Sequence, residues 1–176
     1  MKQTAVTPVV LGLLAMRPRS GYDIKTVVDR STRFFWAASY GQIYPELRRL
    51  EQDGLIEGES VPNGARDRRV YKITAGGRKA LEDWLLGDTV TIELRDESLL
   101  RLFFADALPR EQAIGLLEGR KRGHEEFLAV LRAIDAIPGK DPDFVDLVLH
   151  WGIDFNQWGA DWCEKQLKQL RAKKAA

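Results

Sequence analysis

The sequence predicts a mainly α-helical protein with one small β-hairpin, arranged in two domains. Apolar residues recur at helical spacing through most of the chain, and only residues 55–73 alternate as paired strands do. Charge supplies the third observation. Residues 1–86 carry 14 Lys+Arg and 10 Asp+Glu, whereas residues 87–176 carry 13 and 16. We therefore expect domains over residues 1–87 and 88–176, and we look for a polyanion site in the basic half.

Composition excludes several classes of protein. A chain of 176 residues with 44% hydrophobic and 30% charged residues can bury a core and is not disordered. The lone Cys163 excludes a disulfide framework and a multi-thiol zinc site, and it favours a reducing, cytoplasmic location. The longest apolar run, residues 9–16, is far shorter than the ~20 residues of a membrane span. We interpret it as part of a buried helix.

Two helices are expected near the start of the chain. The first covers residues 7–16, with Thr7 as its N-cap and Pro8 at its first position. Ser20 and Asp23 have the spacing of a capping box and predict a second helix of about ten residues. The all-apolar character of the first helix requires that it be buried.

A third helix, a hairpin and a fourth helix follow. Ser39 is the expected N-cap of the third helix and Gly54 its end. Residues 55–61 and 68–73 form the two strands, and Thr74 caps the next helix. The third helix has apolar anchors at Ile43, Leu47 and Leu50. Three helices, a hairpin and a helix in about 80 residues is the order of a winged helix-turn-helix.

The second half predicts an all-helical domain. One helix ends near Leu108-Pro109, another covers residues 110–137 up to Pro138-Gly139, and a third runs from Asp141 to the end. Apolar residues of the last helix are spaced 4, 3, 4, 3 and 4, which is a heptad seam typical of helices that pack side by side. The seam consists of Phe144, Val148, Trp151, Phe155, Trp158 and Trp162.

The third helix has the composition of a DNA recognition helix. Such a helix needs short polar or aromatic side chains that reach base edges, an apolar back, and cations for the phosphates. Arg48 and Arg49 are the expected phosphate cations. The polar front consists of Ser39, Tyr40, Gln42 and Tyr44. An ordinary amphipathic helix with solvated arginines is the alternative for this helix alone.

The hairpin favours DNA binding. Its tip and return strand place Asn63, Arg66, Arg68 and Arg69 on a projecting loop, where a wing meets the sugar-phosphate backbone. A winged helix that binds only another protein should lack such cations, and it remains the alternative function. The helix and the wing together predict a protein that binds double-stranded DNA.

A family resemblance becomes specific at these residues. Gly21-Tyr22-Asp23-Ile24, the run from Gln42 to Glu51, Asp53-Gly54-Leu55-Ile56 and the run from Arg69 to Gly77 resemble motifs of the phenolic-acid-decarboxylase regulator (PadR) family. Leu99 to Ala105 is similar to the first helix of that family's C-terminal domain, the virulence-activator alpha type. The resemblance implies a prokaryotic dimeric transcription factor, usually a repressor. Ala75-Gly76-Gly77 departs from the family pattern, and we expect these residues to weaken the helix that follows the wing.

The aromatic seam has two interpretations. Together with Leu99 and Phe103, it is either core or a dimer seam, because apolar stripes at helical spacing usually pack. Alternatively, some of its tryptophans line a cleft for a flat ligand, because such ligands stack on indole rings. The resemblance implies aromatic or cationic effectors near the dimer interface. We expect any small aromatic effector to contact Trp151 or Trp158.

Catalytic and metal sites find no support in the sequence. His124, His150 and Cys163 are far apart in the chain and lack the close spacing of metal ligands. No nucleophile motif or glycine-rich phosphate loop occurs, so an enzyme and a bound cofactor are not expected. The sequence therefore predicts a homodimeric transcriptional repressor that binds an inverted-repeat operator.

Overall fold

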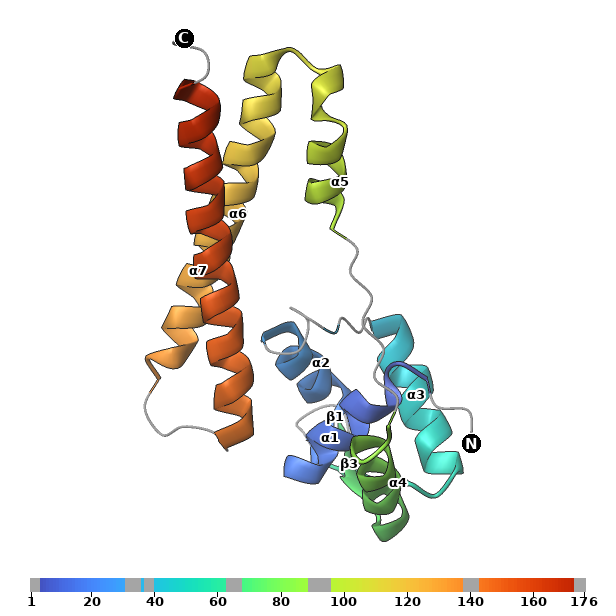
Figure 1. Ribbon diagram of the computed structural model, residues 1–176. Helices are drawn as coiled ribbons and strands as arrows, with labels where there is room; N and C mark the ends of the chain where they lie inside the picture. Colours follow the sequence, from blue (N-terminus) through green and yellow to red (C-terminus); the bar gives the residue numbers. More distant parts are fainter. Residues whose placement is uncertain are drawn as a thin grey trace. The chain divides into compact units, whose positions relative to one another are not determined.

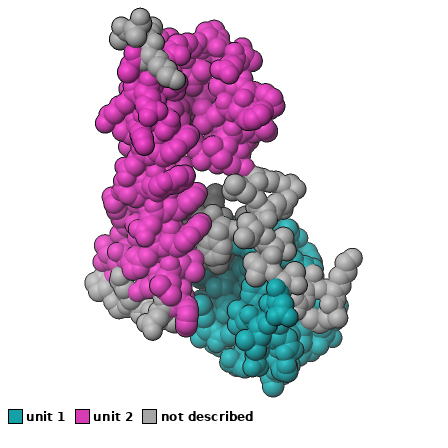
Figure 2. Space-filling model, viewed as in Figure 1, with its two compact units in different colours: residues 1–91 teal, residues 92–176 magenta. Residues whose placement is uncertain are grey.

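A computed structural model describes residues 4–30, 36, 40–62, 68–88, 96–137 and 143–172. The chain divides into two compact units, residues 1–91 and 92–176, shown separately coloured in Figure 2. The division falls within residues 89–95, which lie outside the described residues.

Unit 1 contains four α-helices and a three-stranded antiparallel sheet among its described residues (Figure 1). In chain order its elements are α1 (Thr7–Met16), β1 (Arg19–Ser20), α2 (Gly21–Arg30), α3 (Tyr40–Gln52), β2 (Ile56–Val61), β3 (Arg68–Ile73) and α4 (Ala75–Leu85). The strand order is β1-β3-β2. This is the predicted winged helix-turn-helix order, with one addition. Strand β1 was not expected, because two residues show no alternation.

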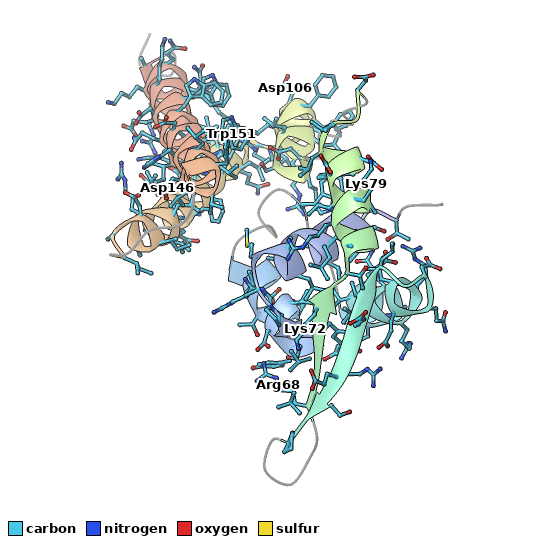
Figure 3. The ribbon with its side chains drawn as sticks, turned by 90° about the horizontal axis from the view of Figure 1, so that it is seen from below. Arg68, Lys72, Lys79, Asp106, Asp146 and Trp151 are labelled. Atoms are coloured by element: carbon cyan, nitrogen blue, oxygen red, sulfur yellow. The ribbon has the colours of Figure 1, made fainter. Side chains whose placement is uncertain are left out.

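The sheet register places the hairpin against the helices. Strands β2 and β3 pair from Ile56 opposite Ile73 to Val61 opposite Arg68, and β1 pairs with β3 through Arg19 opposite Tyr71. Figure 3 shows Arg68 at the outer end of the two long strands, with Lys72 farther along β3. The start of β3 is therefore at the base of the wing.

The core of unit 1 is formed where α1, α2, α3 and the sheet meet. The three predicted anchors of α3 are completely buried. Burial of one such aliphatic side chain contributes about 1.5–3 kcal/mol, so this core fixes the direction of α3. The apolar side chains of unit 1 least exposed to solvent are Val10, Leu11, Leu14, Ile24, Val28, Ile43, Leu47, Leu50 and Ile56.

Two predicted caps are confirmed and one is wrong. Ser20 Oγ accepts from the Asp23 amide at 3.2 Å, and Thr74 Oγ1 accepts from the Gly77 amide at 3.1 Å. Thr7 is not the N-cap of α1, because Val6 occupies that position and Thr7 is already helical. The Thr7 side chain is buried and bonds Glu46 of α3 instead, so a long-range contact replaces the expected local cap.

All regular secondary structure in the described residues of unit 2 is helical. It contains α5 (Glu97–Phe103), a short 3-10 helix (Ala105–Ala107), α6 (Arg110–Asp135) and α7 (Asp143–Ala172). Figure 1 shows α6 and α7 side by side in opposite directions along most of their length. No helix in the described part of the chain is long and apolar enough to cross a membrane.

Small residues allow α6 and α7 to pack closely. A Cβ atom added at Gly159 would lie 2.6 Å from the His124 ring, and one at Gly152 would lie 3.1 Å from Leu131 Cδ1. Buried Asn156 bonds His124 Nδ1 at 2.9 Å and donates to the Gly152 carbonyl at 2.8 Å. The interface also buries Ile114, Leu117, Leu128, Leu131, Ala160, Cys163 and Leu167.

Asp96 connects α5 to α6. Its carboxylate accepts from the Leu99 amide at 3.0 Å, which caps α5, and from Arg120 Nη1 of α6 at 2.7 Å. Burial raises the pKa of Asp96, but hydrogen bonds from Ser98, Arg120 and Leu99 outweigh this effect and lower the pKa to about 2. The carboxylate is therefore more acidic in the folded protein than in the unfolded chain.

This shift predicts a pH dependence of stability. Because the folded pKa is the lower one, the contribution of Asp96 is complete above pH ~4 and is lost as the pH falls through about 2. We expect Asp96→Asn to lower the free energy of unfolding at pH 7 and to have almost no effect near pH 2. Urea unfolding of both proteins across this range measures the difference. An equal loss at both pH values would contradict the assigned role.

Candidate nucleic-acid interface

Helix α3 has one buried face and one exposed face. Ile43, Leu47 and Leu50 hold it against the core, while Gln42, Tyr44 and Arg48 are exposed. The core thus directs the predicted reading residues outward. The remaining members of the polar front, Ser39 and the Tyr40 side chain, lie outside the described residues.

A glycine allows α2 to approach α3. A Cβ atom at Gly21 would lie 2.7 Å from Tyr44 Cε1 and 3.2 Å from Leu47 Cδ1. A larger residue would require the Tyr44 ring or the first turn of α2 to shift, so Gly21 allows the observed close approach of the two helices. The same turn places Tyr44 at the junction between the two helices.

Arg49 belongs to a cluster that joins α3 to α1. Its guanidinium bonds Glu46 Oε1 at 2.6 Å, Asp53 Oδ2 at 2.8 Å and Thr7 Oγ1 at 3.1 Å. Glu46 is only 4% exposed. Burial raises its pKa, but hydrogen bonds from Arg49 and Thr7 outweigh that effect and hold the pKa below its ordinary value. These contacts argue against the phosphate role predicted for Arg49, because two carboxylates already neutralise its charge.

Two wing arginines are connected to the helices. Arg68 pairs with Asp23 in the first turn of α2. Arg69 Nη2 lies 2.6 Å from Glu51 Oε1 of α3, and its guanidinium lies 5.8 Å from the centre of the Tyr71 ring. Both side chains stay about half exposed, so each can position the wing and still face an anion. Asn63 and Arg66 lie outside the described residues.

Most of the predicted seam of α7 does not face α6, although the Phe155 ring at its edge lies 6.0 Å from the His124 ring of α6. The face toward α6 combines small and polar residues with buried Cys163 and Leu167, whereas most of the aromatic seam is exposed on another face of the helix. The Trp151 and Phe155 rings stack with centroids 5.3 Å apart, and those of Phe155 and Trp158 are 6.2 Å apart. The six seam residues, which we call the aromatic face, are 38–79% exposed: Phe144, Val148, Trp151, Phe155, Trp158 and Trp162.

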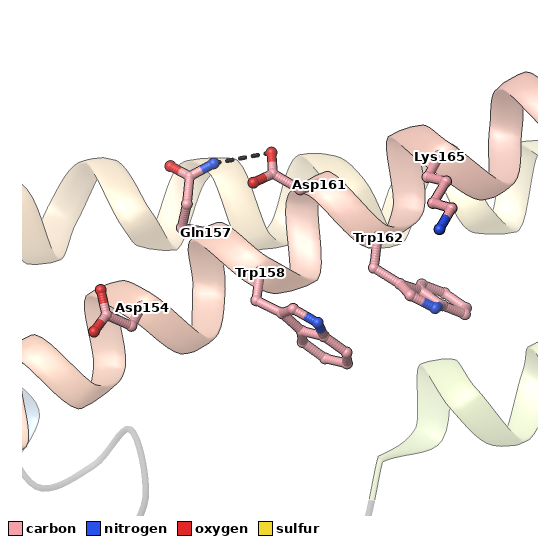
Figure 4. A pocket seen from close by; sticks show the side chains of 6 residues that line it. All are labelled: Asp154, Gln157, Trp158, Asp161, Trp162 and Lys165. Carbon is pink, nitrogen blue, oxygen red and sulfur yellow. Dashed lines mark hydrogen bonds between the residues drawn. The ribbon is translucent and has the colours of Figure 1, made fainter.

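The two residues of α5 that were expected to pack together with the seam are exposed as well. Leu99 and Phe103 of α5 are exposed, with no residue of α5 buried. Figure 4 shows Trp158 and Trp162 projecting from the same side of α7. They line a shallow pocket of about 450 Å³, together with Asp154, Gln157, Asp161 and Lys165.

The described residues contain no cluster of three or more metal-ligating side chains. His124 contacts Asn156 of α7, and His150 Nε2 lies 3.3 Å from Asp135 Oδ1. Cys163 is fully buried in the interface between α6 and α7. All three residues thus take part in the packing of α6 against α7 or in contacts between these two helices.

Comparison with known proteins identifies the family. Residues 10–83 match the transcriptional regulator PadR-like family, and residues 94–171 match the virulence activator alpha C-terminal domain. The chain belongs to the PadR-like family. It is a DNA-binding transcriptional regulator, and the family's members are regulators and not enzymes.

Two relatives with solved structures illustrate the similarity. The negative transcriptional regulator PadR of Bacillus subtilis (strain 168) is 28% identical over 172 residues, covering 92% of this chain and 94% of the relative. Its crystal structure with operator DNA gives a TM-score of 0.83 at 27% identity, covering 95% of this chain and 99% of that one. The crystal structure of the same PadR with p-coumaric acid gives a TM-score of 0.77 and covers 96% of this chain and 99% of that one. The structure of the Vibrio cholerae virulence activator AphA gives a TM-score of 0.69 at 27% identity and covers 95% of this chain and 99% of that one.

Sequence reasoning missed the residues that position the reading surface of this PadR-like chain. Thr7, Glu46 and Asp53 hold Arg49, and Glu51 holds Arg69. Glu46 and Asp53 lie three and four residues from Arg49, a spacing that allows an ion pair on a helix and was the available signal. Thr7 gave no such signal, because its contact with Glu46 spans 39 residues.

Proposed function

We propose that this PadR-like regulator acts as a homodimer whose two winged helices read the two halves of an inverted-repeat operator. Two copies pair through unit 2, residues 92–176. Each α3 then enters the major groove, with half-site centres about 34–36 Å apart. Units 1 and 2 thus serve as the DNA-binding domain and the dimerisation domain expected from the sequence.

The aromatic face of α7 carries this proposal. Its six large apolar side chains are exposed along one continuous face, although a neighbouring face of the same helix is buried against α6. Monomeric soluble proteins rarely expose an apolar patch of this kind. A second copy of the same helix offers an aromatic face of matching spacing, which suits a two-fold symmetric interface.

The contacts to DNA follow from the placement of the side chains. Gln42 and Tyr44 face outward from α3, and with Ser39 and Tyr40 they set register and read bases. The phosphate contacts are assigned to Arg48, Arg66, Arg68 and Arg69, with Asn63 at the wing tip. No phosphate contact is assigned to Arg49, because its guanidinium already donates hydrogen bonds to Thr7 and Glu46.

Neighbouring arginines on α3 allow a matched test. We expect Arg48→Ala to weaken binding to all duplex sequences alike and to lower the slope of log affinity against log salt by about one, since one phosphate contact is lost. We expect Arg49→Ala to lower the free energy of unfolding by about 2–4 kcal/mol, because it leaves Glu46 buried without its cation. Salt titrations and urea unfolding of both variants separate the roles.

The outcome of this pair also bears on the alternative function. A protein-interaction module would show no measurable affinity for duplex DNA at low salt, and Arg48→Ala would change nothing. Similarity to the Bacillus subtilis PadR structure with operator DNA supports DNA binding instead. If Arg48→Ala destabilised the fold while Arg49→Ala changed the salt slope, the two assignments would be reversed.

Repression and release by a small aromatic effector complete the proposal. Support comes from the relative named a negative transcriptional regulator and from its structure with p-coumaric acid. In the single chain, Trp151 and Trp158 are exposed on the aromatic face, and Trp158 lines the pocket in Figure 4, so an effector that contacts them would lie at the dimer interface. A cytoplasmic location, where operator DNA is found, belongs to the same proposal.

The effector contact predicts a fluorescence change. Phenolic acids or hydrophobic aromatic cations that stack on Trp151 or Trp158 should quench tryptophan emission in a saturable manner. Trp84 of α4 also contributes to the emission, so Trp84→Phe serves as the control that keeps the response. Absence of a saturable response to the whole panel would count against an effector on this face.

A further inference from the structure

A second pocket lies in unit 1, beside the first turn of α2. Its volume is about 550 Å³, and its walls come from the loop after α1, from β1, from α2 and from the start of β3. Its charged groups are three arginines and one carboxylate. The lining residues are Arg17, Pro18, Arg19, Asp23, Thr26, Val27 and Arg68.

Arg19 is a buried cation that lacks a full set of partners. It is 7% exposed, and its Nε donates to the Leu13 carbonyl at 3.1 Å. Its Nη1 is buried with no hydrogen-bond partner among the described residues. Burial and the nearby charge of Arg17 lower the pKa of Arg19, and Asp23 opposes them. A buried guanidinium with an unsatisfied donor is costly unless an anion or other acceptor completes it.

The carboxylate of the pocket is already engaged. Asp23 Oδ2 accepts from the Ser20 amide and from Ser20 Oγ, both at 2.9 Å, and also pairs with Arg68. Arg17 is exposed and forms no ion pair within the described part of the chain. The pocket therefore has excess positive charge, to which the N-terminus of α2 adds its dipole.

We propose that this pocket binds a single oxyanion of the phosphate type, held by Arg17 and Arg68 at its rim and by the charge of Arg19 behind them. The phosphate has two sources, a DNA backbone and a free phosphate anion. Gly21 of the same turn contacts Tyr44 of α3, and Asp23 contacts Arg68 at the wing base. A duplex lying on α3 and the wing therefore passes this turn. The DNA source rests on the proposed function, whereas the anion site does not.

The test uses the full chain and two matched variants. Arg17→Ala removes the exposed cation of the pocket that forms no ion pair among the described residues, and Arg78→Ala removes an exposed arginine of α4 in the same unit. Affinity for a random-sequence duplex is measured at several salt concentrations. Separately, inorganic phosphate is titrated into each protein while the amide signals of Ser20 and Gly21 are followed by NMR.

Each outcome is decisive for the pocket. A salt slope lowered by about one in Arg17→Ala but not in Arg78→Ala supports a DNA phosphate. An unchanged slope with saturable phosphate shifts that Arg17→Ala abolishes supports a free anion. If the unmodified protein bound no duplex, the proposed function would fail and the phosphate titration would still test the pocket. No phosphate shifts, together with no effect of Arg17→Ala on any DNA binding, would overturn the proposal.

Discussion

Replacing both Trp151 and Trp158 by glutamate should convert the dimer to monomers and lower operator affinity by about 10²- to 10⁴-fold. The size of the loss follows from tethering, because the second winged helix of a dimer binds at an effective concentration set by the linkage and not by the bulk solution. Both side chains are more than 60% exposed in the single chain, so the substitution leaves the core of unit 2 intact. Analytical ultracentrifugation and operator titration measure the two effects.

The control for this substitution is Ala129→Glu. Ala129 is an exposed residue of α6, where a glutamate adds charge to unit 2 without touching the aromatic face. This variant should remain dimeric and bind the operator normally. A double variant that stayed dimeric would show that the aromatic face is not the dimer seam, and the effector interpretation of the tryptophans would then stand alone.

Two adjacent glycines of α4 should respond to alanine with opposite signs. A Cβ atom at Gly77 would lie 2.1 Å from the Leu55 carbonyl oxygen, a backbone atom that Thr74 also holds through two hydrogen bonds. Because this oxygen cannot move aside easily, Gly77→Ala should lower the free energy of unfolding by about 3 kcal/mol. A Cβ atom at Gly76 meets nothing closer than 3.7 Å. Gly76→Ala should therefore raise the free energy of unfolding by up to about 1 kcal/mol.

Urea unfolding of the two glycine variants, followed by circular dichroism, provides the comparison. They differ by one position in the same helix, so helix propensity affects them similarly and the steric contact separates them. Similar effects from both would contradict the close approach of α4 to Leu55. The pair also gives Gly77 a structural role, although the sequence alone predicts that it weakens the helix. The residue permits the contact that joins α4 to the base of the hairpin.

Local signals predicted much of the fold. The apolar spacing of Ile43, Leu47 and Leu50 placed α3, and the capping pattern of Ser20 and Asp23 placed the start of α2. These signals depend on residues within one or two turns of a helix, which a sequence displays directly. Gly54, with φ of +69°, ends α3 as expected because few other residues adopt that conformation easily.

Long-range contacts account for what the sequence did not predict. Arg48 and Arg49 are equivalent by composition, and only the fold shows that Thr7 and Glu46 hold the second of them. The heptad spacing on α7 could not show which partner the aromatic residues meet, because it is the same for a helix of this chain and for a helix of another. Gly152 and Gly159, seven residues apart, were the available sign that a different face packs on α6.

Selection of bound duplexes from a random DNA pool, followed by salt titration of the selected site, tests the central claim most directly. A dimer that reads DNA with α3 and the wing should recover an inverted repeat with half-site centres about 34–36 Å apart, and its affinity should fall steeply with salt. Recovery of a single unrepeated site would contradict the dimeric arrangement. Absence of enrichment at low salt would contradict DNA reading by the winged helix.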